Sequence, residues 1–158
     1  MDDLETASID AWAAGRVVLF LDVDGVLNQC GHFQDVLTSK AQLLRRIVVE
    51  TSCSIVVSST WRRNADTRKL LVQLLMENDV SIHDWTPQLD KITDHGLHSI
   101  PERGHEIQAW LDSHPEVTRF VILDDAADMA HLMEHLVQTE SFTGLTEALT
   151  REVIRRLK

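Results

Sequence analysis

The sequence predicts an α/β protein, with a central, mostly parallel five-stranded sheet in a Rossmann-like three-layer α/β/α sandwich. Short apolar segments alternate with segments that carry apolar residues at helical spacing, as expected when crossover helices join parallel strands. The segment Val17–Leu21 contains only apolar residues, which is typical of a strand buried on both faces. A length of 158 residues suits one domain of this kind, so we expect a single domain over 1–158.

Each element has its own support along the chain. Apolar runs predict strands at 17–21, 54–59, 80–83, 120–123 and 136–139. Apolar residues three to four positions apart predict helices at 40–50, 65–78, 102–113, 126–132 and 146–157. Pro115 would end the third of these helices, and Thr143 or Thr146 would cap the last.

Two segments fall outside this alternation. Residues 1–15 precede the first strand, and we expect them to form an N-terminal extension. Residues 84–101 are polar and irregular and contain Pro87, Gly96 and Pro101. Such composition is typical of a loop, so we expect 84–101 to be a mobile loop near the functional site.

Composition narrows the classes of function. The net charge of -10 argues against tight non-specific binding of nucleic acid, which depends on lysine and arginine. No apolar stretch reaches the length of a membrane span, so we expect no membrane partner. The acidic N-terminus, with Arg16 as its first basic residue, differs from a signal peptide. Cys30 and Cys53 make no disulfide framework, so we expect reduced thiols and a cytoplasmic location.

Two carboxylates follow the first strand directly. Asp22 and Asp24 stand one residue apart, and Gly25 then allows the backbone to turn sharply. Open α/β sheets bind ligands at this carboxyl end of their strands. Adjacent carboxylates repel each other unless a cation or a shared proton lies between them. The pair therefore predicts a hard divalent cation, Mg²⁺ by preference, held by oxygen ligands.

Other polar side chains are expected at the same edge of the sheet. The hydroxyl residues Ser58–Thr60 end the second strand, and the acids Asp124–Asp125 follow the fourth. Arg103 stands at the start of the helix that leads into the fourth strand. Because the carboxyl ends of parallel strands share one edge, these groups should meet. Acids, hydroxyls and a cation together predict a site for a phosphorylated ligand.

The first and last of these groups resemble motifs of the haloacid dehalogenase (HAD) superfamily of phosphohydrolases. That family begins with Asp-x-Asp-Gly-Thr/Val, and residues 22–26 read Asp-Val-Asp-Gly-Val. Its fourth motif is an acidic pair after an apolar strand, which matches Asp124 and Asp125. The resemblance covers roughly residues 17–128.

The two middle motifs are shorter. The second is a Ser or Thr that ends an apolar strand, and it matches Ser59, with Ser58 as the competing register. The third is a Lys or Arg at a helix start, and it matches Arg103, with Lys91 in reserve. A narrower likeness to the HAD domains of Swiss-army-knife RNA repair proteins lies in the segments 27–28, 58–62, 103–107 and 144–146.

The resemblance implies a phosphatase mechanism. Asp22 would attack phosphorus and form an aspartyl-phosphate, and Asp24 would act as general acid and then as general base. Ser59 and Arg103 would hold the phosphoryl oxygens. The implied Mg²⁺ ligands are Asp22, the backbone carbonyl of Asp24, and Asp124 or Asp125. Further substrate contacts are expected from Gly25, Ser58, Thr60 and Arg62, although Arg62 could instead only pack along Trp61.

The spacing of the motifs bears on the substrate. Neither the segment between Asp24 and Ser59 nor the one between Ser59 and Arg103 is long enough for a full cap domain. An open site would admit a bulky phosphomonoester, such as a nucleic-acid end, a nucleotide or a phosphoprotein. The alternative is a catalytically weak phosphate-binding or regulatory module that keeps the fold. A dinucleotide-binding enzyme is disfavoured because no Gly-x-Gly-x-x-Gly follows the first strand.

Overall fold

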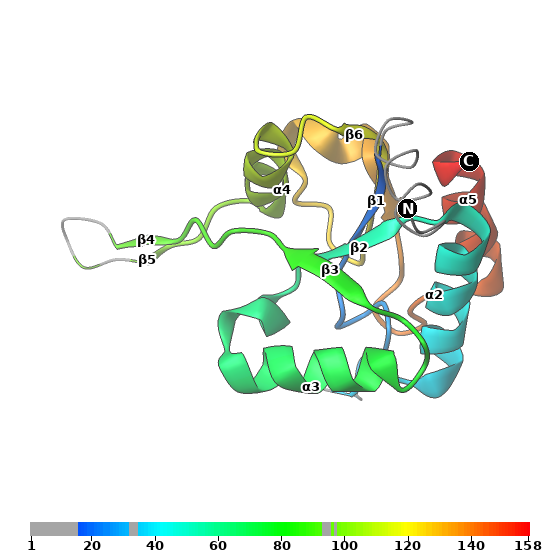
Figure 1. The fold of residues 1–158 in the computed structure, drawn as a ribbon. Helices are drawn as coiled ribbons and strands as arrows, with labels where there is room; N and C mark the ends of the chain where they lie inside the picture. The colour runs from blue at the N-terminus through cyan, green and yellow to red at the C-terminus, as the bar shows by residue number, and fades with distance from the viewer. Residues whose placement is uncertain (1–15, 32–34, 93–95, 97) are drawn as a thin grey trace, which may run out of the picture.

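A five-stranded sheet forms the centre of the computed structural model, which describes residues 16–31, 35–92, 96 and 98–158 (Figure 1). The strands lie in the order β3-β2-β1-β6-β7, and every neighbouring pair is parallel. Their bounds are Arg16–Leu21 (β1), Ser54–Val57 (β2), Ile82–Trp85 (β3), Val117–Asp124 (β6) and Leu136–Gln138 (β7). The predicted α/β fold is therefore confirmed, whereas the predicted extension 1–15 lies outside the described residues.

Helices cover both faces of the sheet. The α-helices are Thr38–Thr51 (α2), Ala65–Met76 (α3), Arg103–Asp112 (α4) and Glu147–Leu157 (α5). Two 3₁₀ helices, Thr60–Arg63 (η1) and Ala130–His135 (η2), follow β2 and precede β7. A two-stranded antiparallel hairpin, Lys91–Ile92 (β4) and His98–Ser99 (β5), projects away from the sheet (Figure 1). No helix among the described residues is both long and apolar enough to cross a membrane.

The alternation of side chains along the strands divides the core into two layers. Leu19 and Leu21 of β1 pack in a cluster with buried residues of α2, α3 and α5. Val18 and Phe20 point to the other face and pack against α4 and η2. All four of these β1 side chains are fully buried, as predicted for a strand covered on both faces.

Helix caps agree with local sequence chemistry. The side chain of Thr146 accepts a hydrogen bond from the backbone N–H of Leu149 (3.2 Å), which confirms one of the two predicted caps of α5. Asn64 caps α3 in the same way, through the N–H of Asp66 (2.7 Å). These side chains satisfy N–H groups that the helix itself leaves unpaired.

The third strand begins two residues later than predicted. The apolar character of Val80 suggested a strand start, but its N–H bonds to the carbonyl of Leu75 (2.9 Å) and closes the end of α3. Asp79 has a left-handed φ of 59°, which turns the chain toward β3. Val80 is buried where the chain leaves α3, so its apolar character reflects packing at the helix end and not strand pairing.

Two other predicted elements also differ. The predicted helix at 126–132 is wrong, because Ala130 has a φ of 51° and only the 3₁₀ helix η2 forms from there. The predicted loop 84–101 contains the end of β3 and the β4–β5 hairpin, and its mobility stays a prediction. Within the described residues, neither segment between the motifs forms a second domain over the sheet edge (Figure 1).

The start of α4 packs directly on the turn that follows β6. The N–H of Gly104 donates to the carbonyl of Asp128 (3.1 Å). A Cβ placed on Gly104 would lie 2.0 Å from the carbonyl oxygen of Met129. Only glycine permits this approach, which fixes where the neighbouring Arg103 enters the sheet edge.

We expect Gly104→Ala to destabilise the protein by about 2–3 kcal/mol, because the added methyl must push backbone apart. Chemical denaturation would measure the free energy of unfolding. A Gly→Ala change in open helical surroundings instead stabilises by about 1 kcal/mol. A stabilised variant would therefore contradict this close packing.

Candidate active site

The ladder of the sheet places three polar residues at one level. Leu21 pairs with Val57 on one side and with Leu123 on the other. The ladder continues one residue further, since Ser58 N donates to Leu21 O and Asp22 N donates to Leu123 O, both at 3.0 Å. Asp22 therefore stands between Ser58 and Asp124.

These three side chains share one face of the sheet. Phe20, Val56 and Ile122, two residues before them on the three strands, all belong to the core layer beneath α4. Because side chains alternate along a strand, Asp22, Ser58 and Asp124 point to the same layer. The helix that carries Arg103 covers this face.

Three carboxylates form a candidate metal site. Oxygen atoms of Asp22, Asp124 and Asp125 all lie within 4.8 Å of one another. Asp22 and Asp124 are buried, and Asp125 is partly buried. The N–H of Ala126 donates to Asp124 (2.9 Å), and the hydroxyl of Ser141 donates to Asp125 (2.6 Å). An all-oxygen set with fixed orientation fits a hard divalent cation such as Mg²⁺.

Arg103 lies across two of these acids. Its Nη1 atom donates to Asp22 Oδ1 (3.0 Å) and to Asp124 Oδ2 (3.2 Å). The predicted cation therefore reaches the predicted acids. Lys91, the reserve candidate, belongs to β4 of the projecting hairpin, and its side chain lies outside what the structure describes.

Burial and mutual repulsion favour the protonated forms of Asp22 and Asp124. Burial raises the pKa of Asp22 to about 6, because it outweighs the attraction of Arg103, and the charge of Asp125 adds to the rise. Burial, followed by repulsion from Asp22, raises the pKa of Asp124 to about 9. One guanidinium thus leaves excess negative charge, which a divalent cation would relieve.

Asp24 is held apart from the three clustered carboxylates. Its Oδ1 accepts a hydrogen bond from Asn28 Nδ2 (2.9 Å), and its Oδ2 accepts one from Trp61 Nε1 (3.2 Å). Among the described residues, its side chain does not belong to the group of three acids that could hold a metal ion. This separation suits an acid and base better than a side-chain ligand, and the predicted metal contact of Asp24 was through its backbone carbonyl.

The two serines have different surroundings. Ser59 uses its hydroxyl to accept a hydrogen bond from Trp61 N (3.2 Å), which caps η1. The hydroxyl of Ser58 is buried and has no hydrogen-bond partner among the described residues. A buried hydroxyl without a partner costs free energy and often marks a ligand contact. The geometry therefore favours Ser58, the competing register, over Ser59.

The contacts of Arg62 argue against its predicted role in substrate binding. The side chain is almost fully buried and forms an ion pair with Glu106 (Nη2 to Oε1, 2.6 Å). Its remaining donors bond to backbone carbonyls of Ser58, Ser59, Thr86 and Pro87. A guanidinium has five N–H donors, and all five are used here.

Gly25 and Thr60 are the other two residues with a predicted substrate contact, and their surroundings differ. The N–H of Gly25 donates to Asn28 Oδ1 (2.8 Å), so it is not directed at a substrate. Gly25 has a φ of +80°, and a Cβ there would lie 2.2 Å from Asp125 Oδ2. Because glycine has no Cβ, Gly25 allows the first motif to lie close to Asp125. Thr60 is exposed at the start of η1, and its predicted substrate contact stays a prediction.

Several supporting residues were missed by sequence reasoning. Asn28 is fully buried and connects Asp24, Gly25 and the carbonyl of Asp35 (2.8 Å). Thr139 and Ser141 follow β7; they bond to the carbonyl of Gly25 (2.6 Å) and to Asp125. Only their position in the sequence could have predicted this role, because polar residues that follow the fifth parallel strand lie at the same edge of the sheet.

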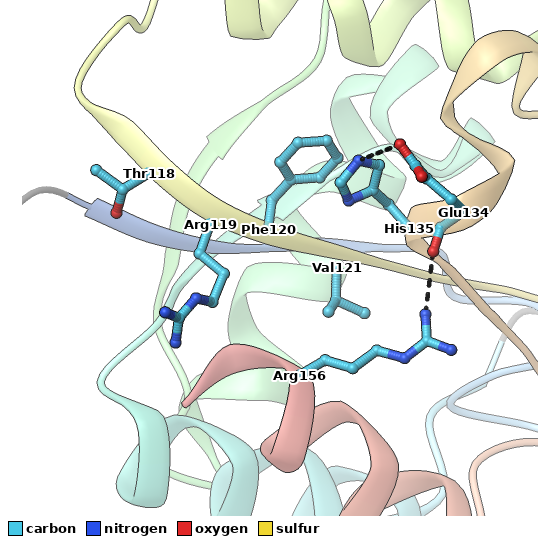
Figure 2. A pocket seen from close by; sticks show the side chains of 7 residues that line it. All are labelled: Thr118, Arg119, Phe120, Val121, Glu134, His135 and Arg156. Atoms are coloured by element: carbon cyan, nitrogen blue, oxygen red, sulfur yellow. Dashed lines mark hydrogen bonds and ion pairs between the residues drawn. The ribbon is translucent and has the colours of Figure 1, made fainter.

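A separate cavity of about 420 Å³ lies beside the first half of β6 (Figure 2). Arg119, Arg156 and the stacked rings of Phe120 and His135 line it. It opens there because β7 pairs only with residues 122–124 of β6. None of the clustered acids lines this cavity, so it is distinct from the candidate active site.

The comparisons with known proteins agree with this geometry. A family model described as "HAD domain in Swiss Army Knife RNA repair proteins" matches residues 18–149. No curated protein and no solved structure matches the chain significantly.

The raised pKa values of Asp22 and Asp124 predict how stability depends on pH without metal. Both values lie above the ordinary 3.8, so the folded state binds more protons than the unfolded state above about pH 4. The associated stability is complete below about pH 4 and is lost as the pH rises through about 6 and then about 9.

In EDTA, we therefore expect the free energy of unfolding to fall by on the order of 5 kcal/mol between pH 5 and 8. Urea denaturation would measure it, and saturating Mg²⁺ should flatten the slope. Asp124→Asn is the control, because it removes the repulsion and leaves the opposing effect of His83, whose pKa burial lowers. Equal slopes in wild type and Asp124→Asn would contradict the assignment.

Proposed function

Because this chain belongs to the family of HAD domains in Swiss Army Knife RNA repair proteins, we propose that it is a Mg²⁺-dependent phosphohydrolase. The family supports a hydrolase of the HAD type. One observation carries the finer proposal: Asp22, Asp124 and Asp125 converge within 4.8 Å at the sheet edge, where Arg103 bridges two of them. Acids for a metal and a cation for phosphate are thus assembled around one nucleophile candidate.

The clustered acids would hold the metal. Asp22, Asp124 and Asp125, with the backbone carbonyl of Asp24, provide hard oxygen ligands for Mg²⁺. When bound, the ion neutralises charge on the phosphoryl oxygens, which otherwise repel an incoming carboxylate. Ser141 and the N–H of Ala126 keep two of the ligands oriented.

Asp22 would act as the nucleophile. Its carboxylate oxygen forms a bond to phosphorus while the ester P–O bond breaks, which gives an aspartyl-phosphate and an alkoxide leaving group. Asp24 protonates that leaving oxygen, and then removes a proton from the water that attacks phosphorus. The aspartyl P–O bond breaks, inorganic phosphate leaves and the Asp22 carboxylate is restored. The hydrogen bonds from Asn28 and Trp61 keep Asp24 in place for both proton transfers.

Arg103 and Ser58 would hold the phosphoryl oxygens. Charge spreads over these oxygens in the transition state of phosphoryl transfer, so fixed donors nearby lower the barrier. Arg103 already contacts Asp22, and Ser58 lies beside Asp22 at the end of the ladder, with a hydroxyl that has no hydrogen-bond partner among the described residues. We assign to Ser58 the role first predicted for Ser59.

The proposed substrate is a bulky phosphomonoester. The described residues form no cap domain over the sheet edge, so a nucleic-acid end, a nucleotide or a phosphoprotein could approach. The family description favours a nucleic-acid end. The net charge of -10 implies that such a substrate would be bound at its phosphorylated end more than along its backbone.

Phosphate release tests the proposal. We expect turnover of p-nitrophenyl phosphate and of 3′- or 5′-phosphorylated oligonucleotides that requires Mg²⁺ and stops with EDTA. Asp22→Asn should lower kcat by at least about 10³-fold, and Asp24→Asn by about 10²–10⁴-fold. Asp112→Asn, an exposed acid on α4, is the matched control. A folded wild type that binds Mg²⁺ but releases no phosphate would favour the alternative of a phosphate-binding or regulatory module.

The two serines offer a second test. We expect Ser58→Ala to lower kcat by about 10²-fold, because it removes a donor to the transition state. Ser59→Ala should instead cost about 1 kcal/mol of stability through loss of the η1 cap and leave kcat nearly unchanged. Paired measurements of kcat and thermal midpoint would separate the two. The reverse pattern would restore Ser59 as the phosphate ligand.

A further inference from the structure

We infer that Arg62 and Glu106 are positioning residues that together fix the phosphate-holding groups of this site. The inference rests on the proposed function and concerns two residues that carry no direct role in it. Their ion pair is buried, with side-chain exposures of 1% and 4%. It joins η1, which follows Ser58, to α4, which begins with Arg103.

Arg62 fixes the backbone around the serines. Its Nη1 atom donates to the carbonyl of Ser58 (3.1 Å) and to the carbonyl of Ser59 (3.0 Å). These two bonds hold the peptide planes on both sides of the Ser59 Cα. The direction of the Ser58 side chain depends on that backbone, so Arg62 acts on the phosphate through Ser58.

Arg62 also fixes the segment after β3. Its Nε donates to the carbonyl of Thr86 (3.1 Å), and its Nη2 donates to that of Pro87 (3.4 Å). Gln88 returns a bond from its Nε2 to the carbonyl of Arg62 (3.3 Å). The start of the connection to the hairpin is thereby tied to the end of β2.

Glu106 fixes the first turn of α4. It stands three residues after Arg103, which places the two on neighbouring positions of the helix surface. Its Oε1 pairs with Arg62 (2.6 Å), and its Oε2 accepts the N–H of Leu89 (3.0 Å). The helix that carries Arg103 is therefore held to the same guanidinium that holds Ser58.

Stability alone does not require charges at this place. Burying two ions costs desolvation free energy, and well-packed apolar residues of similar volume are often as stable or more so. An apolar pair, however, gives no direction to the carbonyls that Arg62 orients. A planar, five-donor group supplies that direction, and lysine cannot replace it. The pair is thus suited to setting the relative position of Ser58 and Arg103.

An apolar double substitution separates positioning from stability. Arg62→Met and Glu106→Leu each leave a buried charge without its partner, so each should lower the thermal midpoint strongly. The double variant should recover the part of that loss that comes from an unpaired buried charge, but not the part that comes from the backbone carbonyls that lose Arg62 as their donor. It should nevertheless keep a kcat/KM for p-nitrophenyl phosphate about 10–100-fold below wild type. The affinity for inorganic phosphate with Mg²⁺ should fall about tenfold, while that for Mg²⁺ alone changes less than about threefold.

Matched variants control the comparison. Arg46→Met/Glu147→Leu makes the same double substitution at the surface pair that joins α2 to α5, on the opposite face of the sheet (Figure 1). It should leave kcat/KM and phosphate affinity unchanged. Arg62→Lys keeps the charge but loses the five-donor geometry, so it should show the same catalytic loss, and it decides the question if the double variant does not fold.

The outcomes are distinct. A folded double variant or Arg62→Lys with wild-type kcat/KM and phosphate affinity would overturn the inference and make the pair purely structural. An equal fall in Mg²⁺ affinity would also overturn it, because that would indicate a general loosening of the sheet edge. If wild type hydrolyses no phosphate ester, the proposed function fails, and the inorganic phosphate affinities still decide whether the pair positions the site.

Discussion

Mutual repulsion of carboxylates at one buried edge is the constraint to which the surrounding structure responds. Asp22, which follows β1, and Asp124, which ends β6, lie at the same level of neighbouring strands, with an oxygen of Asp125 within 4.8 Å of both. Arg103 supplies one positive charge, and backbone or hydroxyl donors supply the rest of the local compensation. The absence of a Cβ at Gly25 and at Gly104 lets the first motif and α4 come close enough for this to happen.

The sheet and most of its helices follow from periodic patterns in the sequence. A short continuous apolar run such as 17–21 is typical of a strand covered on both faces, and β1 has this form. Local pattern failed where a left-handed residue changed the path of the chain, at Asp79 before β3 and at Ala130, the first residue of η2. Most aspartates and alanines have a negative φ, so neither residue type alone predicts these turns. At Asp79 the positive φ accompanies the local hydrogen bonds that end α3, from Asp79 N to Met76 O and from Val80 N to Leu75 O.

The residues of the candidate site also fall into those that the sequence predicted and those that it did not. Asp22, Arg103 and the acidic pair after β6 were predictable because motif spacing and parallel topology bring them to one edge. The choice between Ser58 and Ser59 was not, because an uninterrupted apolar strand gives no sign of which face each residue takes. The packing of α4 on one face of the sheet favours Ser58, which we propose as the phosphate contact. For Arg62 the sequence left a phosphate contact and packing along Trp61 both open, because its ion-pair partner, Glu106, lies far along the chain.

The short strand β7 has a consequence for how the protein behaves among its own copies. Because β7 pairs only with residues 122–124, the earlier part of β6 has no strand beside it on that edge among the residues that the structure describes. Edges of this kind can recruit strands from other molecules. That edge carries the exposed Thr118 and the charged Arg119, and an open hollow replaces any flat apolar margin (Figure 2). Charge and irregular shape at an unprotected margin discourage edge-to-edge aggregation. This part of β6 is therefore less suited to edge-to-edge pairing than a flat apolar strand would be.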